Sequence, residues 1–141
     1  MDTIISGVIG HPIEHSLSPI IHNAAYKQLG LNWKYEKFDL APENARQGIK
    51  DIFEKGCGGL NVTMPHKDLA YEMSTAHGAA SRLRTVNTLI SDEENKLHGY
   101  STDGQGFIES LKSENVDVEQ KQVLVLGAGG ASRAICDSLL R

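Results

Sequence analysis

Short apolar runs alternate with helix-like stretches along most of the chain, and this alternation limits the fold more than any other feature. Each run is either continuously apolar or alternates apolar and polar side chains, as buried and half-buried strands do. The predicted strands of the first half cover residues 3–10, 33–40 and 59–65. The predicted helices between them cover residues 18–29 and 42–55. Strands that alternate with helices predict an α/β fold with a mostly parallel, twisted sheet and helices on both faces.

The second half adds one antiparallel element to that sheet. Residues 85–91 and 95–100 are predicted strands joined by the polar turn "DEEN", which indicates a hairpin. Two short helical pieces precede the hairpin, and a helix over 102–113 follows it. An apolar run at 123–126 then predicts one more buried strand, before a glycine turn and a final helix.

Composition and charge exclude several classes of partner. The net charge is −4 and the lysines and arginines do not cluster, so we expect no nucleic acid partner. No apolar stretch approaches the ~18 residues that a membrane span requires, and the first residues do not resemble a signal peptide. Cys57 and Cys136 are far apart and outside any metal or disulfide pattern, which predicts reduced thiols and a cytoplasmic protein. The histidines have no recognisable ligand spacing, so we expect no metal site.

Polar residues that follow strands are the candidates for chemistry, because ligands of such sheets bind beyond the carboxyl ends of the strands. In "NVTMPHK", Asn61 and Thr63 share one face of a strand and Lys67 follows its end. A lysine in a partly dry cleft can exchange a proton with a substrate oxygen, whereas a solvated surface lysine is the commoner case. His66 is a weaker candidate for the same task.

Three further polar groups stand at informative places. Asp103 lies in the first turn of a predicted helix that Thr102 or Ser101 is expected to cap, and the helix dipole there keeps a carboxylate ionised. Asn87 is an amide within an apolar strand, and a buried amide needs hydrogen-bond partners. Ser18 is the predicted N-cap of the helix that Pro19 opens. Ser16 has no such role, and two hydroxyls beside free helix amides suit a carboxylate.

The glycine turn "GAGGAS" lies between a predicted strand and a predicted helix. Gly127, Gly129 and Gly130 allow a pyrophosphate to approach the helix N-terminus, although Ser132 stands where the strict dinucleotide pattern has glycine. The residue that reads the ribose would lie ~20 positions beyond the glycines, and the sequence ends eleven positions after Gly130. The segment is therefore expected to be the truncated start of a Rossmann unit, or to pack in some other way.

Five blocks in this order resemble the shikimate dehydrogenase family. They are "GVIGHPIEHSLSPIIHNAAY", "NVTMPHK", "VNTL", "GYSTDGQGF" and "VLGAGGASRA". The family reduces 3-dehydroshikimate to shikimate with NADPH, in aromatic amino-acid biosynthesis. The resemblance implies a shikimate-binding catalytic domain over residues 1–114. Residues 115–141 would be the first strand, glycine turn and helix of an incomplete NADP-binding Rossmann domain.

The resemblance also implies roles for individual residues. Ser16 and Ser18 would hold the substrate carboxylate, and Lys67 would exchange the proton at the reacting oxygen with Asp103 beside it. The groups that bind the ring oxygens would be Asn61, Thr63, Asn87 and Asp103. The residues at the cofactor pyrophosphate would be Gly127, Ala128, Gly129, Gly130 and Ala131. Two places depart from the family pattern: Arg84-Thr85 replaces Gly-Ala, and Ser101 replaces Asn.

Two alternatives remain open from the sequence. A quinate/shikimate dehydrogenase has nearly the same blocks, and the paired serines favour shikimate only slightly. A non-catalytic module that binds a shikimate-like acid would need only the first domain. In either case we expect the chain alone to be inactive, and we expect it to be able to self-associate through its incomplete C-terminal segment.

Overall fold

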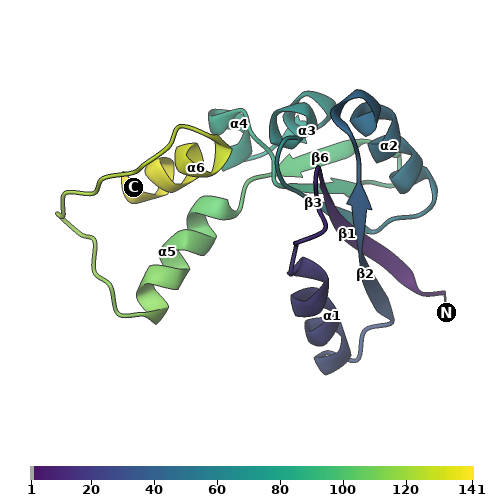
Figure 1. Ribbon diagram of the computed structural model, residues 1–141, viewed down its shortest axis with the longest axis horizontal. Coiled ribbons are helices and arrows are strands. Elements are labelled where there is room, and N and C mark those ends of the chain that lie inside the picture. The colour runs from purple at the N-terminus through teal and green to yellow at the C-terminus, as the bar shows by residue number, and fades with distance from the viewer. Residues whose placement is uncertain (1) are drawn as a thin grey trace.

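The computed structural model describes residues 2–141, and its centre is a six-stranded sheet with the strand order β2-β1-β3-β5-β6-β4 (Figure 1). The strands are β1 (Ile4–Gly10), β2 (Trp33–Asp39), β3 (Gly59–Val62), β4 (Thr75–Ala76), β5 (Thr88–Ser91) and β6 (Leu97–Tyr100). The helices are α1 (Ser18–Gln28), α2 (Pro42–Glu54), α3 (Lys67–Met73), α4 (Ala79–Leu83), α5 (Asp103–Ser113) and α6 (Gly130–Leu139).

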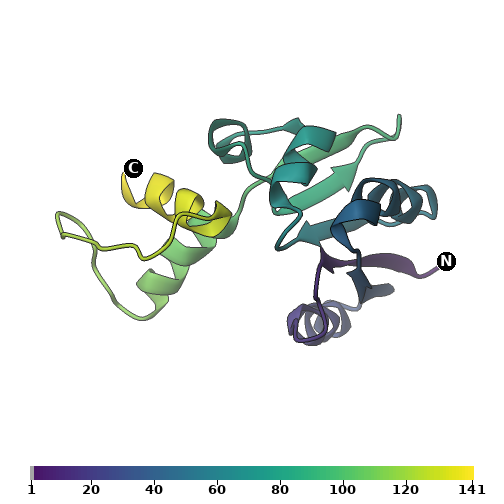
Figure 2. The ribbon, with the colours of Figure 1, turned by 45° about the horizontal axis from the view of Figure 1, so that its top comes forward.

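The sheet is mostly parallel, as the alternating pattern predicts. β1 pairs in parallel with β2 and β3, and β4 pairs in parallel with β6. β5 is antiparallel to both β3 and β6, so within residues 2–141 it is the one strand that runs the other way. Helix α1 covers one face of the sheet while α2 and α3 cover the other (Figure 2). The predicted hairpin and the helices on both faces are therefore confirmed.

The main core lies between the sheet and the helices α2 and α3. It is built on side chains that are 0–1% exposed, chief among them Ile9, Ile49, Leu60, Val86 and Leu89. These residues come from β1, α2, β3, the segment before β5, and β5 itself. Burial of large aliphatic side chains stabilises such elements by about 1.5–3 kcal/mol each. The core thus fixes the strand ends at which the candidate residues lie.

Helix α1 packs in a different way from the one its apolar pattern indicates. Ile20 and Ile21 are 68% and 66% exposed, and no residue of α1 is buried. The side chains of α1 that meet the sheet are polar or aromatic: the Asn23 amide bonds to both backbone groups of Tyr35, and the Tyr26 hydroxyl lies 2.9 Å from Ser6 Oγ. Hydrogen bonds and aromatic ring contacts, rather than burial of its isoleucines, therefore hold α1 against β2 and β1.

The strand predicted at 123–126 is absent. Leu124 and Leu126 are 84% and 88% exposed, and none of the six strands lies in this segment. A strand needs a neighbour for its backbone donors and acceptors, and residues 2–141 offer none here. Helix α6 forms as predicted and packs on α5, apart from the sheet (Figure 1). Among residues 2–141, no helix is long and apolar enough to cross a membrane.

Candidate functional site

Lys67 and Asp103 meet at the centre of the candidate site. Lys67 is the first residue of α3 and Asp103 the first of α5, and Lys67 Nζ lies 2.5 Å from Asp103 Oδ2. Their side chains are 20% and 28% exposed, so solvent screens this ion pair only in part. Two residues 36 positions apart in the sequence are thus in direct contact.

The backbone of Lys67 is held on both sides. The preceding residue, His66, is 2% exposed, and its Nε2 lies 2.7 Å from the Leu40 carbonyl oxygen. The Lys67 carbonyl accepts a hydrogen bond of 3.1 Å from the Val86 amide. His66 is therefore a buried structural residue and not an exposed group available for proton exchange.

Asn87 orients Asp103 from the opposite side. Its Nδ2 donates to Asp103 Oδ1 at 2.6 Å, and its Oδ1 accepts from the Thr102 amide at 3.1 Å. The Thr102 hydroxyl also lies 3.0 Å from Asn87 Nδ2 and forms no helix cap. The expectation that Thr102 or Ser101 would cap α5 through its side chain is wrong, because the Thr102 hydroxyl is bonded to Asn87 and the Ser101 hydroxyl is buried without a partner.

A second amide continues this set of contacts across the sheet. Asn61 on β3 pairs in register with Thr88 on β5, and Asn61 Nδ2 donates to Thr88 Oγ1 at 3.3 Å. Thr88 Oγ1 donates to Asn87 Oδ1 at 3.0 Å. The Tyr35 hydroxyl donates to Asn61 Oδ1 at 2.7 Å. Sequence reasoning missed Tyr35 and Thr88, since only the strand register brings them to Asn61.

Ser16 and Ser18 lie together, as the sequence indicates. Ser16 Oγ donates to Ser18 Oγ at 3.2 Å, and the Ser18 amide donates to Ser16 Oγ at 3.3 Å. The predicted role of Ser18 as a helix cap is wrong, because Leu17 occupies that position and no side chain caps α1. Burial raises the pKa of Tyr35, as does the nearby Tyr26, whereas a hydrogen bond from Ser18 acts in the opposite direction. The serine pair thus lies close to Tyr35.

A cavity of about 350 Å³ joins the lysine to the glycine turn. Its lining includes Thr63 and Lys67 from the sheet side and residues 129–131, with Arg133, from α6. Gly127 and Ala128 are not part of this lining, so the structure brings three of the five predicted pyrophosphate residues to Lys67.

The glycine turn fits a phosphate group sterically. A Cβ on Gly130 would lie 3.1 Å from Thr85 Oγ1 and 3.5 Å from Lys67 Cδ, so glycine keeps the backbone open at this point. The Thr85 hydroxyl is buried and has no hydrogen-bond partner. Free amides at the start of α6 and an unused hydroxyl beside them are compatible with an anionic cofactor.

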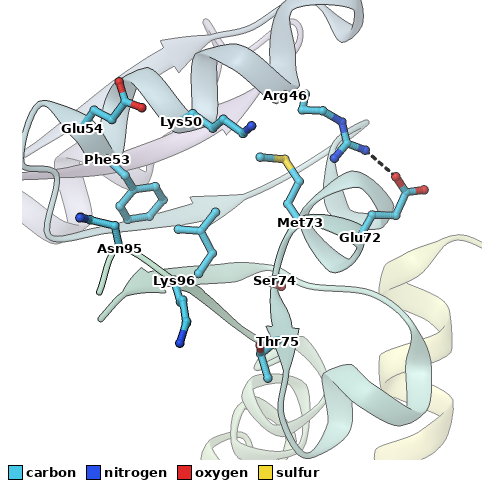
Figure 3. A pocket seen from close by; sticks show the side chains of 11 residues that line it. Arg46, Lys50, Phe53, Glu54, Glu72, Met73, Ser74, Thr75, Asn95 and Lys96 are labelled. Carbon is cyan, nitrogen blue, oxygen red and sulfur yellow. Dashed lines mark hydrogen bonds and ion pairs between the residues drawn. The ribbon is translucent and has the colours of Figure 1, made fainter. Parts of the chain in front are cut away.

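A larger cavity, of about 600 Å³, lies elsewhere between α2, the end of α3 and the β5–β6 turn (Figure 3). Phe53 and Met73 form part of its lining, and Arg46 is paired with Glu72 at 2.8 Å. None of the predicted site residues lines it. Over residues 2–141, no group of three or more His, Cys, Asp or Glu side chains could hold a metal ion.

Curated relatives and solved structures are similar to nearly the whole chain. A shikimate dehydrogenase (NADP(+)) from Caldanaerobacter subterraneus is 45% identical over 140 residues, which are 99% of this chain and 50% of the relative. A protein of the same name from Methanothermobacter thermautotrophicus is 44% identical over 133 residues, 94% of this chain and 46% of the relative. The chain therefore spans about half the length of the curated relatives it matches.

Among solved structures, the shikimate 5-dehydrogenase of Thermus thermophilus in complex with shikimate has a TM-score of 0.90 at 37% identity. That match covers 97% of this chain and 52% of the other. A shikimate dehydrogenase in complex with NADP⁺ has a TM-score of 0.91 at 42% identity, covering 97% and 48%. The model that describes the shikimate dehydrogenase substrate binding domain matches residues 8–89, more than half of the sequence. The chain belongs to the shikimate dehydrogenase substrate binding domain family.

Proposed function

We propose that this chain forms the shikimate-binding part of an NADP-dependent shikimate dehydrogenase, which interconverts 3-dehydroshikimate and shikimate. The observation that carries the proposal is the contact between Lys67 and Asp103, which Asn87 orients. The names of the relatives and the bound shikimate in the Thermus thermophilus structure support it.

The polar groups match the substrate from one end to the other. The hydroxyls of Ser16 and Ser18 would donate to the carboxylate, and the partly positive start of α1 would favour its charge. Thr63, Asn61 and Asn87 would bind the ring oxygens, with the Asp103 carboxylate accepting from a substrate hydroxyl. Such fixed contacts orient the reacting carbon and oxygen before the chemical step.

Lys67 would act as the general acid and base. Its ammonium would give a proton to the ketone oxygen during reduction and recover it during oxidation, and Asp103 would keep the ammonium in place. A positioned general acid contributes about 10²–10⁴-fold to the rate. NADP(H), when bound, supplies or accepts the hydride, and the start of α6 at residues 129–131 would hold its pyrophosphate.

A calorimetric titration of the chain with shikimate tests the proposal. We expect binding by the wild-type chain without reduction of NADP⁺, because the chain spans about half the length of the curated relatives it matches. Ser16→Ala should weaken binding by about 10- to 150-fold, because each lost hydrogen bond to a charged group is worth ~1.5–3 kcal/mol. Lys50→Met, which removes an exposed lysine distant from these residues, is the control and should leave binding unchanged. Equal affinity of the Ser16→Ala and wild-type chains would refute the proposed carboxylate site.

Three expectations from the sequence remain predictions. The predicted division into domains between residues 114 and 115 is tested by limited proteolysis, which should cleave the chain between α5 and α6. Self-association through the incomplete C-terminal segment, residues 115–141, is tested by sedimentation analysis of the chain. A cytoplasmic location needs localisation in cells.

A further inference from the structure

We propose that Tyr35 is a positioning residue that couples the two ends of the substrate site. This inference rests on the proposed function, because it assigns the serine pair and the Lys67–Asp103 pair to one ligand. Tyr35 is hydrogen-bonded to α1, the helix that begins at Ser18. Its hydroxyl donates to Asn61, and further hydrogen bonds lead from there to Asp103. Sequence reasoning gave Tyr35 no role.

The hydrogen bonds from Tyr35 to Asp103 all run in one direction. The Tyr35 hydroxyl donates to Asn61 Oδ1 at 2.7 Å. Each hydroxyl thereby donates its single proton to the next residue of the series, so no hydroxyl can donate in the reverse direction.

The second half of the series keeps the same direction. Asn61 Nδ2 donates to Thr88 Oγ1, and Thr88 Oγ1 donates to Asn87 Oδ1. Asn87 Nδ2 then donates to Asp103 Oδ1 at 2.6 Å. Since a carboxylate can only accept, Asp103 fixes the direction of the series at its far end. A change at Tyr35 therefore alters which way the Asn61 and Asn87 amides are held.

Tyr35 is itself held on three sides. Its amide donates to Asn23 Oδ1 at 2.8 Å, and its carbonyl accepts from Asn23 Nδ2 at 3.0 Å. The His22 ring stacks on the Tyr35 ring with centroids 4.1 Å apart and planes 8° from parallel. Only 3% of Tyr35 is exposed. Asn23 and His22 belong to α1, which also carries Ser18, so one helix fixes both the serine and the tyrosine.

This arrangement has a consequence for binding. A carboxylate bound at the serines would hold the start of α1, and α1 holds Tyr35 through Asn23. Substrate bound at this end would therefore change how firmly the series that ends at Asp103 is held. Hydrogen-bonded chains strengthen their members mutually, so this change is transmitted along the series.

The experiment compares Tyr35→Phe with Tyr26→Phe in the full chain. Tyr26→Phe is the matched control, because it also removes one hydroxyl contact between α1 and the sheet, to Ser6, but lies outside the series. The first readout is the set of side-chain amide signals of Asn61 and Asn87 in ¹⁵N NMR spectra without ligand. Tyr35→Phe should shift both signals, and Tyr26→Phe should leave them in place.

The second readout is shikimate affinity in a double-mutant cycle. Tyr35→Phe and Thr88→Val should each weaken binding by about 3–10-fold, the effect of one neutral hydrogen bond. The double variant should bind shikimate about as tightly as the weaker-binding single variant, because both changes interrupt the same series. The proposal would be overturned if the two losses of shikimate affinity multiplied in the double variant. It would also be overturned if the Asn87 side-chain amide signal did not shift in Tyr35→Phe.

The two readouts separate this inference from the function on which it rests. If the wild-type chain does not bind shikimate, the proposed function fails. The amide signals of the free chain still decide whether Tyr35 orients Asn61 and Asn87. Thr88→Val removes a later hydrogen bond of the series and leaves Tyr35 intact, so the test remains possible even if the Tyr35→Phe variant misfolds. The Asn87 side-chain amide signal of Thr88→Val should shift. If that signal does not shift, the series is refuted.

Discussion

Two glycines of α5 give a sharp test of how α6 packs. Gly104 is buried, and a Cβ there would lie 2.3 Å from the Ala134 carbonyl oxygen and 2.3 Å from Ser138 Oγ. Gly106 lies in the same helix, and its Cβ would meet nothing within 4 Å. Replacing glycine by alanine within a helix stabilises it by ~0.5–1 kcal/mol. Overpacking at a tight contact costs ~1–3 kcal/mol.

The balance of these two effects differs between the variants. Gly106→Ala should raise the free energy of unfolding by ~0.5–1 kcal/mol, because only the helix propensity changes. Gly104→Ala gains the same propensity but must displace α6 from α5, so the overpacking cost exceeds the gain. Two exposed ion pairs also tie α6 to the sheet side, Arg133 to Asp68 and Arg82 to Asp137, and such pairs contribute at most ~1 kcal/mol each. They are too weak to hold α6 against the clash.

Amide hydrogen exchange of α6 is the suitable assay, with thermal unfolding as a second measurement. Relative to Gly106→Ala, the α6 amides of Gly104→Ala should exchange about 5- to 150-fold faster, which corresponds to ~1–3 kcal/mol. Equal stabilisation by the two alanines, with unchanged exchange in α6, would show that α6 does not pack against Gly104.

Three further outcomes are expected. Hydrogen bonds from Arg141 and from an arginine of α4 lower the pKa of Asp137 to about 2 from 3.8. The stabilisation of α6 by these bonds is therefore present above pH 3.8 and lost as the pH falls toward 2. Amide hydrogen exchange of α6 in the Asp137→Asn variant should lack this pH dependence. Gly10→Ala places a Cβ 2.5 Å from the Thr63 methyl carbon; it should lower the unfolding free energy by ~1–3 kcal/mol and weaken shikimate binding, and unchanged values of both would contradict the close contact. Thr85→Val removes a buried hydroxyl that has no partner; the melting temperature should rise, by the equivalent of ~1 kcal/mol, and a fall would indicate that the hydroxyl has a bond not seen in the structure.

The elements with strong local patterns were predictable from the sequence. The alternation in 33–40 and the buried run in 3–10 became β2 and β1, and the polar turn between β5 and β6 closed the hairpin. The strand at 123–126 was not predictable in the same way. Its apolar pattern indicates only that the segment could form a buried strand. Whether the strand forms depends on a neighbouring strand, which residues 2–141 do not supply.

The candidate site was predictable residue by residue, but its connections were not. Lys67, Asp103 and Asn87 each follow a local signal, and the structure brings them into contact. The link from Asn61 to Thr88 depends on the register between β3 and β5, which no local signal gives. The predictions of side-chain caps failed because the Thr102 hydroxyl is bonded to Asn87 and because Leu17, not Ser18, stands at the N-cap of α1.

The 350 Å³ cavity takes one wall from Lys67, the first residue of α3, and the other from Gly130, the first residue of α6. A molecule that touched both walls would fix the start of α6 relative to α3. A second molecule bound beside it would then meet a protein with less conformational freedom to lose, so each ligand would strengthen the binding of the other by the same factor. Order of addition would therefore leave the final affinities unchanged, and each ligand would bind more weakly alone than together with the other.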